Sequence, residues 1–163
     1  MDRLETDDVE LVAATDVPRV LSEDRDGYTL SCDPRRLQPD RIHACLTEIY
    51  WSKGIDLATV ARLLRHSFCV GVYAGGTQVA LTRVITDFTT FAWLTDVYVE
   101  KEHQGRGLAS WMVDFILRHP DLQNLRRFLL ASRDARDLYR RFGFTEPRHP
   151  ERIMELFPRQ PVP

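Results

Sequence analysis

One stretch of the sequence, residues 95–112, constrains the fold and the chemistry of this chain more than any other. It starts with β-branched and aromatic residues typical of a strand, Val97 to Val99, and passes through a charged turn to Gly105 and Gly107. Apolar residues then recur at helical spacing until Pro120. A glycine-rich loop between a strand and a helix favours anion binding, because free backbone N–H groups and the positive end of the helix dipole meet there. We therefore predict that this loop binds a phosphate or pyrophosphate group.

The spacing of the loop residues distinguishes between several kinds of phosphate loop. The Walker pattern, G-x-x-x-x-G-K-[ST], is absent. The dinucleotide pattern, G-x-G-x-x-G, requires a third glycine where this chain has Ser110. A third pattern, Q/R-x-x-G-x-G/A, is met in full by Gln104, Gly107 and Ala109. An ordinary strand–loop–helix turn without a ligand is the remaining alternative at this point.

The third pattern resembles the loop of the GNAT superfamily of N-acetyltransferases. Residues 50–54, residues 90–97 and the pair His119-Pro120 resemble a bacterial subgroup of its single-domain members. A second run of residues carries the same resemblance. Asp134 is predicted to begin a short helix, and Tyr139, Gly143 and Phe144 match the Y-x-x-x-G-F ending of the other family motif. One predicted strand separates the two motifs, and the resemblance covers roughly residues 27–157.

Hydrophobic patterning predicts an α/β (α+β) fold with a mixed central sheet. The predicted strands are 27–32, 68–73, 78–86, 90–99, 127–131 and 153–157, and the predicted helices start at 39, 56, 107 and 134. The element order β-αα-βββ-α-β-α-β places an antiparallel meander before a parallel β-α-β unit. A Rossmann domain has its glycine loop after the first strand of successive parallel units, so this order argues against a dinucleotide site. It is the order of the GNAT fold.

The length of 163 residues suits one domain with a proper core and hardly suffices for two. Residues 1–26 are acidic and show little periodicity, so we predict a poorly ordered or loosely packed N-terminal arm. We predict a single acetyltransferase domain at 27–157 and a proline-rich tail at 158–163.

Composition excludes several classes of function. The net charge of −2 gives no general attraction to nucleic acid or to an anionic membrane. No apolar run approaches the ~20 residues of a membrane span, and the first residues lack the features of a signal peptide. The three cysteines form no C-x-x-C pair, which argues against zinc and against a disulfide framework. We expect a cytoplasmic protein without a metal, a nucleic-acid partner or a membrane partner.

The resemblance implies acetyl-CoA as the acetyl donor and a primary amine of a small molecule or peptide as the acceptor, joined in one ternary complex. The pantetheine arm would pair with the backbone of Val97, Tyr98 and Val99, provided that this strand splays from the strand after residue 126. Asp134 is explained as a helix N-cap, with contact to the pantetheine arm as the alternative. The pyrophosphate would lie on Gln104, Gly105, Arg106, Gly107, Leu108, Ala109 and Ser110.

The resemblance also assigns the catalytic groups. Tyr139 matches the general acid that protonates the leaving thiolate, since a phenol is protonated at neutral pH. Asp96 is our candidate general base, and a buried acid that fixes its strand is the alternative role. Asp87 and Glu100 are the other carboxylates near the predicted thioester site. In the family, a carboxylate acting through water or bulk solvent alone also serves as the base.

The acceptor side is expected at the first two helices and their link, where Tyr50 and Trp51 either line a pocket mouth or fill the core. Two other functions compete with acetyl transfer. One is a non-catalytic acetyl-CoA sensor or interaction module on the same fold. The other is an NADP-type binder that uses the glycine loop with Arg133. Homodimers are common in the family, and the sequence does not identify the acceptor.

Overall fold

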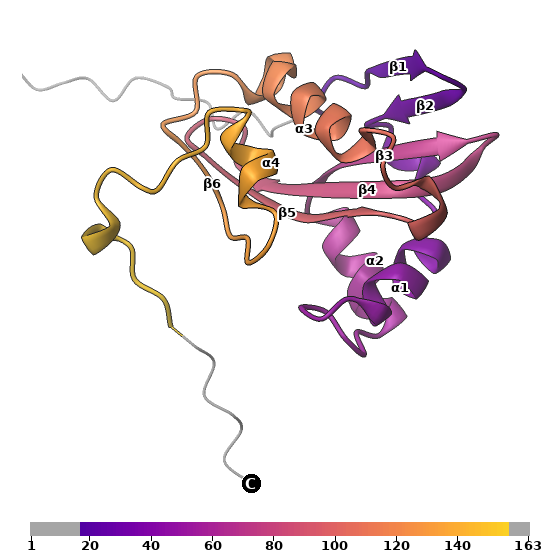
Figure 1. Ribbon diagram of the computed structural model, residues 1–163, viewed down its shortest axis with the longest axis horizontal. Helices are drawn as coiled ribbons and strands as arrows, with labels where there is room; N and C mark the ends of the chain where they lie inside the picture. The colour runs from indigo at the N-terminus through magenta and orange to yellow at the C-terminus, as the bar shows by residue number, and fades with distance from the viewer. Residues whose placement is uncertain (1–16, 157–163) are drawn as a thin grey trace, which may run out of the picture. The chain divides into compact units, whose positions relative to one another are not determined.

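The computed structural model describes residues 17–156, which fall into two compact units divided between Ala131 and Ser132 (Figure 1). No helix among the described residues is long and apolar enough to cross a membrane.

The first unit is built on a six-stranded sheet whose spatial order follows the chain, β1-β2-β3-β4-β5-β6. Neighbouring strands are antiparallel except β5 and β6, which are parallel and joined through helix α3. The predicted meander and the predicted β-α-β unit are thus confirmed. The strands are β1 (Ser22–Arg25), β2 (Tyr28–Ser31), β3 (Phe68–Ala74), β4 (Thr77–Thr86), β5 (Phe91–Val99) and β6 (Arg127–Leu130).

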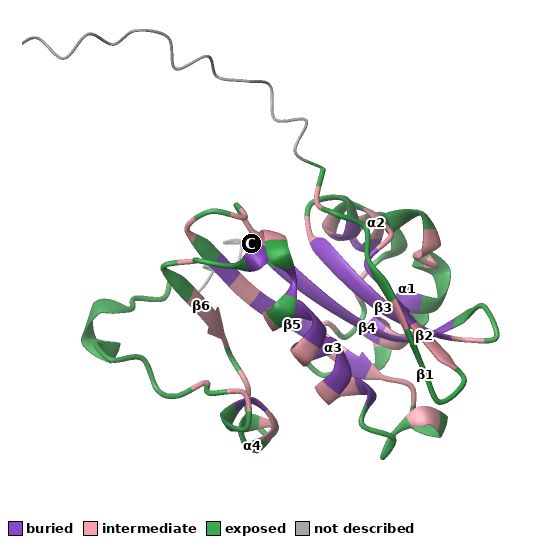
Figure 2. Ribbon diagram, turned by 90° about the horizontal axis from the view of Figure 1, so that it is seen from above, coloured by how far each residue is buried: buried purple, intermediate pink, exposed green. Residues whose placement is uncertain are grey.

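Helices cover both faces of this sheet (Figure 1). Helices α1 (Pro39–Glu48) and α2 (Leu57–Arg65) lie on one face, and α3 (Leu108–Arg118) lies on the other. Buried residues run along the central strands β3 and β4, whereas β1 is mostly exposed (Figure 2). The core under α1 and α2 consists of Ile42, Leu46, Val60, Leu64, Cys69, Leu81 and Tyr98.

Short local signals place the first two helices where the sequence predicts them. Pro39 occupies the first turn of α1, where its missing N–H is not needed. The Asp56 carboxylate accepts the N–H of Thr59 at 2.8 Å and so caps α2. Three short 3-10 helices join the elements of this unit, at Pro34–Arg36, Lys101–His103 and Pro120–Leu122.

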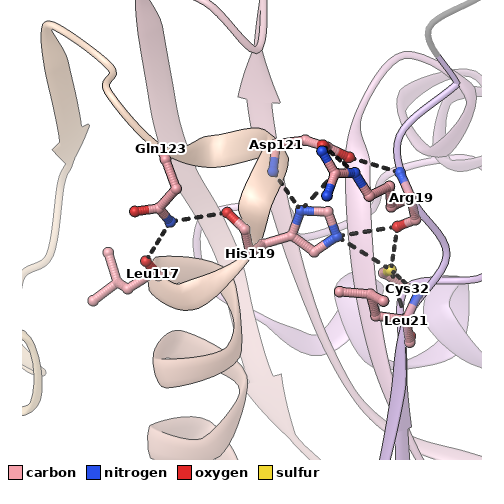
Figure 3. A network of polar contacts seen from close by, with 7 residues as sticks. All are labelled: Arg19, Leu21, Cys32, Leu117, His119, Asp121 and Gln123. Carbon is pink, nitrogen blue, oxygen red and sulfur yellow. Dashed lines mark hydrogen bonds and ion pairs between the residues drawn. The ribbon is translucent and has the colours of Figure 1, made fainter.

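Figure 3 shows the polar network that fixes the C-terminal end of α3 against residues 19–21 and Cys32, just after β2. The buried His119 lies at its centre, and its Nδ1 accepts the N–H of Asp121 at 3.3 Å. Its Nε2 therefore carries the proton and donates to the carbonyl of Arg19 at 3.0 Å. The Sγ of Cys32 lies 3.8 Å from the same nitrogen, and burial raises the pKa of this thiol.

Strand β5 has two irregular features. In its pairing with β4, two residues, Asp96 and Val97, lie between the partners of Leu81 and Arg83, which forms a bulge. Asp96 has a φ of 49°, in the left-handed region. Strand β5 pairs with β6 only from Phe91 to Leu94. Within the described residues, the rest of β5 therefore has no strand partner on that side. The predicted splay between these two strands is therefore present.

The second unit contains one short helix, α4 (Arg136–Arg140), and a 3-10 turn at Pro150–Arg152. Gly143 follows α4 with a φ of 85°, and the N–H of Phe144 reaches back to the carbonyl of Tyr139 at 3.2 Å. A left-handed glycine just after a helix is a common stop signal, which explains why the chain turns there.

Three sequence predictions about these elements need correction. Residues 22–25, part of the predicted N-terminal arm, form β1 with β2 as its partner, while residues 1–16 of that arm lie outside the described part of the chain. Asp134 is not the N-cap of α4; Ala135 is, and the Asp134 carboxylate lies 3.4 Å from Arg133 instead. The predicted last strand is not formed at residues 153–156, where Met154 and Leu156 are exposed. An apolar run becomes a strand only where a neighbouring strand pairs with it, and none does so here within the described residues. Phe157 lies outside them.

Candidate functional site

Two residues of the glycine loop have the left-handed backbone conformation. Gly105 has a φ of 75°, and Gly107, the N-cap of α3, has a φ of 73°. Residues other than glycine rarely adopt this backbone conformation, so both glycines are needed for the loop to follow this path. The sequence pattern is therefore explained by backbone geometry.

The loop carries a run of free backbone donors. From Gly105 to Ser110, no N–H group has a hydrogen-bond acceptor within the described residues. Trp111 is the first residue of α3 whose N–H is bonded, to the carbonyl of Gly107 at 3.0 Å. Six successive free donors at a helix N-terminus suit an anionic group, which the helix dipole also favours.

Gln104 has a different place from its neighbours in the loop. Its backbone N–H bonds the carbonyl of Lys101, so it is not one of the free donors. Its side-chain amide donates to the carbonyl of Val99 at 3.0 Å. Gln104 thus connects the start of the loop to the end of β5. Arg106 is exposed in the middle of the loop.

A cleft of about 670 Å³ lies beside the unpaired part of β5. Its lining residues come from α1, the α1–α2 link, the end of β5 and the turn that leads into the loop. Val97, Tyr98 and Val99 all line it. Val97 and Val99 are half-buried, while the Tyr98 ring also packs into the core under α1 and α2. The remaining lining residues are Arg41, Ala44, Cys45, Glu48, Ile49, Trp51, Glu100, Lys101, Glu102 and Gln104.

The two aromatic residues of the α1–α2 link have different positions. Trp51 lines the cleft, whereas Tyr50 is not among its lining residues. Their rings pack edge to face with centroids 4.8 Å apart, and both are about half exposed. The structure therefore brings Trp51, but not Tyr50, to the cleft with β5.

Trp51 also contacts Asp96. Its indole N–H donates to Oδ1 of Asp96 at 3.0 Å, while Oδ2 accepts from Nε of Arg83 at 2.6 Å. The Asp96 and Arg83 side chains are only 7% and 10% exposed, and Arg83 also donates to Ser67 at 2.5 Å. Both carboxylate oxygens of Asp96 are occupied by donors. This geometry favours the alternative in which Asp96 fixes the bulge of β5.

Of the carboxylates considered from the sequence, Glu100 is the one that lines the cleft, together with Glu48 and Glu102. Its Oε1 accepts from Arg41 at 2.6 Å and from the Cys45 thiol at 3.7 Å. Burial, and then the negative charge of Glu100, raise the pKa of Cys45, so this thiol is protonated at neutral pH. Arg41 was not predicted as a site residue. A single arginine on the polar face of a predicted helix gave no signal for it.

Asp87, the other carboxylate considered from the sequence, serves the turn between β4 and β5. It accepts the N–H groups of Thr89, Thr90 and Phe91 and the hydroxyl of Thr90. These hydrogen bonds, led by the Thr90 hydroxyl, hold the pKa of Asp87 well below its usual range. Asp87 therefore has a structural role in the turn.

Tyr139 and Asp134 belong to the second unit. Tyr139 is buried, and its ring packs edge to face against Phe144 with centroids 6.1 Å apart. Burial, with a smaller effect from the negative charge of Asp134, raises the pKa of the Tyr139 phenol. The phenol is therefore protonated at neutral pH, as a proton donor must be. Among residues 17–156, no group of three or more His, Cys, Asp and Glu residues is placed to hold a metal ion.

A mixed sheet that opens beside a glycine loop of free N–H groups is the architecture of an acyl-group transferase of the GNAT type. Comparison with known proteins agrees. The model of the acetyltransferase (GNAT) domain family matches residues 65–146. A Gibberella zeae protein whose name assigns it to the acetyltransferases is 36% identical over 138 residues, which cover 71% of this chain and 77% of the relative. This chain belongs to the GNAT acetyltransferase family.

Two solved structures illustrate the likeness in fold. A GNAT-family protein of Xanthomonas campestris pv. campestris is 46% identical, with a TM-score of 0.78 over 80% of this chain and 92% of that one. A Clostridium acetobutylicum acetyltransferase, solved with acetyl-CoA, is 16% identical, with a TM-score of 0.59 over 80% of this chain and 94% of that one. The second likeness concerns the fold alone.

Proposed function

We propose that this protein transfers the acetyl group of acetyl-CoA to a primary amine of a small molecule or peptide. One observation carries the proposal: six N–H groups from Gly105 to Ser110, free within the described residues, come one short 3-10 turn after a strand whose last part has no strand partner there on one side. The first feature suits a pyrophosphate, and the second suits the amides of a pantetheine arm. Acetyl-CoA carries both groups in that order along one molecule.

The donor is held entirely by backbone in this proposal. The pyrophosphate accepts hydrogen bonds from the loop, and the pantetheine amides pair with the unpaired part of β5, at Val97 and Val99. The related Clostridium acetobutylicum structure holds acetyl-CoA, which supports this choice of donor. A fixed donor turns a bimolecular encounter into an oriented one, which lowers the barrier by up to ~7–11 kcal/mol in favourable cases.

The acceptor amine enters from the cleft lined by Trp51 and Glu100. Its nitrogen lone pair attacks the thioester carbonyl, the C–N bond forms, and the C–S bond then breaks. Tyr139 gives its phenolic proton to the leaving sulfur. The amine loses its proton to Glu100, directly or through water, because Glu100 lines the cleft and its Oε2 has no partner within the described residues. Asp96, with both oxygens occupied, positions Trp51 instead.

Calorimetric titration of acetyl-CoA tests the donor site without knowledge of the acceptor. We expect binding by the native protein and none by Gly107→Val, because valine is strained at a φ of 73° and its side chain would cover the loop donors. Gly76→Val is the matched control, since Gly76 also has a positive φ, of 86°, but lies in the β3–β4 turn. Tight binding by the Gly107 variant would exclude the loop as the phosphate site.

A panel of amines then tests the reaction, with release of free coenzyme A as the signal. We expect turnover with at least one primary amine. Binding of acetyl-CoA without release across small amines, amino acids and peptide amines would instead support the non-catalytic sensor. Preferential thermal stabilisation by NADPH over acetyl-CoA would support the dinucleotide alternative.

A further inference from the structure

The geometry points to the β1–β2 hairpin as the element that holds the glycine loop in its phosphate-binding form, with Arg25 and Tyr28 as positioning residues. This inference rests on the proposed function, because it concerns how the loop receives the pyrophosphate of acetyl-CoA. The hairpin lies about 80 residues before the loop in the sequence, outside the residues matched by the family model.

Arg25 holds the end of the loop. Its Nη2 donates to the carbonyl of Gly107 at 3.4 Å, and its guanidinium lies 4.3 Å from the ring centroid of Trp111. The Gly107 carbonyl and the Leu108 N–H belong to the same peptide plane and point in opposite directions. The Gly107 carbonyl also accepts the N–H of Trp111, so Arg25 adds a second contact to a group whose direction sets that of the Leu108 N–H, one of the six free donors.

Tyr28 holds the start of the loop. Its hydroxyl lies 2.9 Å from Nδ1 of His103, and the two rings pack edge to face with centroids 5.7 Å apart. His103 ends the 3-10 helix just before Gln104, and its own N–H bonds the carbonyl of Glu100. The hairpin thus contacts the chain on both sides of the two left-handed glycines.

The hairpin is itself fixed on α3. Glu23 accepts the indole N–H of Trp111 at 3.0 Å, and it pairs with Arg118 at 3.1 Å. Trp111 is almost fully buried, so its position is determined by the core beneath it. The other end of α3 is held by the His119 network (Figure 3). Hairpin, loop and helix therefore form one connected frame.

Such a frame lowers the entropy that the loop must lose when an anion binds. Glycines in a loop leave many backbone conformations accessible, and only some of them direct all six N–H groups at one ligand. Without Arg25 and Tyr28 the loop keeps its sequence but loses two of its fixed points. The effect is confined to the pyrophosphate, since the pantetheine arm uses β5 and not the loop.

Equilibrium dissociation constants for coenzyme A and for pantetheine, which lacks the pyrophosphate, separate this effect from a general loss of structure. Ligand-observed NMR measures both, including the weaker binding of pantetheine. We expect Arg25→Ala to weaken coenzyme A binding ~10-fold and Tyr28→Phe about 3-fold, with less than about 2-fold change for pantetheine. Arg25→Lys should recover part of the loss, because it keeps a donor but not the planar group over Trp111. Arg62→Ala, which removes an exposed arginine of α2, is the charge-matched control and should change neither constant.

Equal weakening of coenzyme A and pantetheine, or no change for either, would overturn the positioning role. Urea unfolding of each variant checks that the fold is retained, and Tyr28→Phe provides a test if Arg25→Ala does not fold. Failure of the native protein to bind coenzyme A would instead remove the proposed function, and this inference with it. The two failures are distinguished by the native protein alone.

Discussion

The buried pair of Arg83 and Asp96 allows a sharp test of what the carboxylate does. We expect Asp96→Asn to destabilise the protein by ~3–5 kcal/mol, because it leaves the Arg83 charge buried without a partner. The structure supports a value in this range: the two side chains are 10% and 7% exposed, and the ionic contact is 2.6 Å long. Asparagine tolerates the φ of 49° and can still accept the Trp51 indole N–H, so the loss of charge is isolated.

Two further variants separate the contributions of the charge, the Trp51 hydrogen bond and the backbone conformation to this loss of stability. Asp96→Ala should cost ~2 kcal/mol more than Asp96→Asn, since it also loses the Trp51 hydrogen bond and places a non-glycine, non-Asx residue at positive φ. The double variant Arg83→Met with Asp96→Asn should recover much of the loss, because no unpaired charge remains in the core. Asp114→Asn is the matched control: its contact with Arg118 is 2.7 Å long but about half exposed, so we expect less than ~0.5 kcal/mol.

Urea unfolding followed by far-ultraviolet circular dichroism gives each free energy, with the slope m as a check that the cooperative unit is unchanged. A loss for Asp96→Asn no larger than that for Asp114→Asn would refute the view that Asp96 ties the bulge of β5 to β4. Enzyme kinetics provide a second criterion. Once an acceptor is known, a pH profile of kcat/KM that loses its acidic limb in Asp96→Asn would restore Asp96 as the base.

Three further predictions follow from buried groups. Tyr139→Phe should lower turnover by ~100-fold or more with little change in acetyl-CoA affinity, and unchanged steady-state turnover would remove the proton-donor role. Burial raises the pKa of Cys69 from 9.0 to about 12, so the folded state favours the protonated thiol over the thiolate. The contribution of this thiol to the free energy of unfolding is fully present below pH 9 and is lost as the pH rises toward 12. Between pH 8 and pH 10.5, the free energy of unfolding of the native protein should therefore decrease by about 2 kcal/mol more than that of Cys69→Ala. Parallel plots of the free energy of unfolding against pH for the two proteins would contradict this. Within the described residues, the buried Tyr73 hydroxyl has no hydrogen-bond partner, so Tyr73→Phe should be neutral or stabilising by up to ~1 kcal/mol in urea unfolding. A loss above that size would show that the hydroxyl is satisfied.

The glycine loop and the order of the elements could be predicted from the sequence because each rests on local rules. Gly105 and Gly107 lie where the backbone takes a positive φ, and no tertiary contact is needed to infer that. The meander and the helices have clear periodicities, and the structure confirms their order. The family resemblance then linked the loop to a cofactor, which the loop residues alone left open.

The features that the sequence did not reveal depend on contacts between distant residues. Strand β1 is mostly charged. It forms a strand because it pairs with β2 and because its Glu23 accepts a hydrogen bond from Trp111 of α3. The pairing of Arg83 with Asp96 depends on a bulge, in which Asp96 follows Thr95, the strand partner of Arg83. Of the neighbours Tyr50 and Trp51, only Trp51 lines the cleft, because of the way the chain turns after α1. No pattern of residue types predicts such a difference.

The position of β1 at the margin of the sheet has a further consequence, for solubility. An outermost strand presents a row of unpaired backbone groups, and flat apolar margins of this kind associate with one another. Strand β1 has only four residues, and Glu23, Asp24 and Arg25 put three charges on them. Such a margin resists edge-to-edge association with another copy. Hydrophobic replacements in β1 would therefore favour aggregation of the folded protein, and light scattering at rising concentration would detect it.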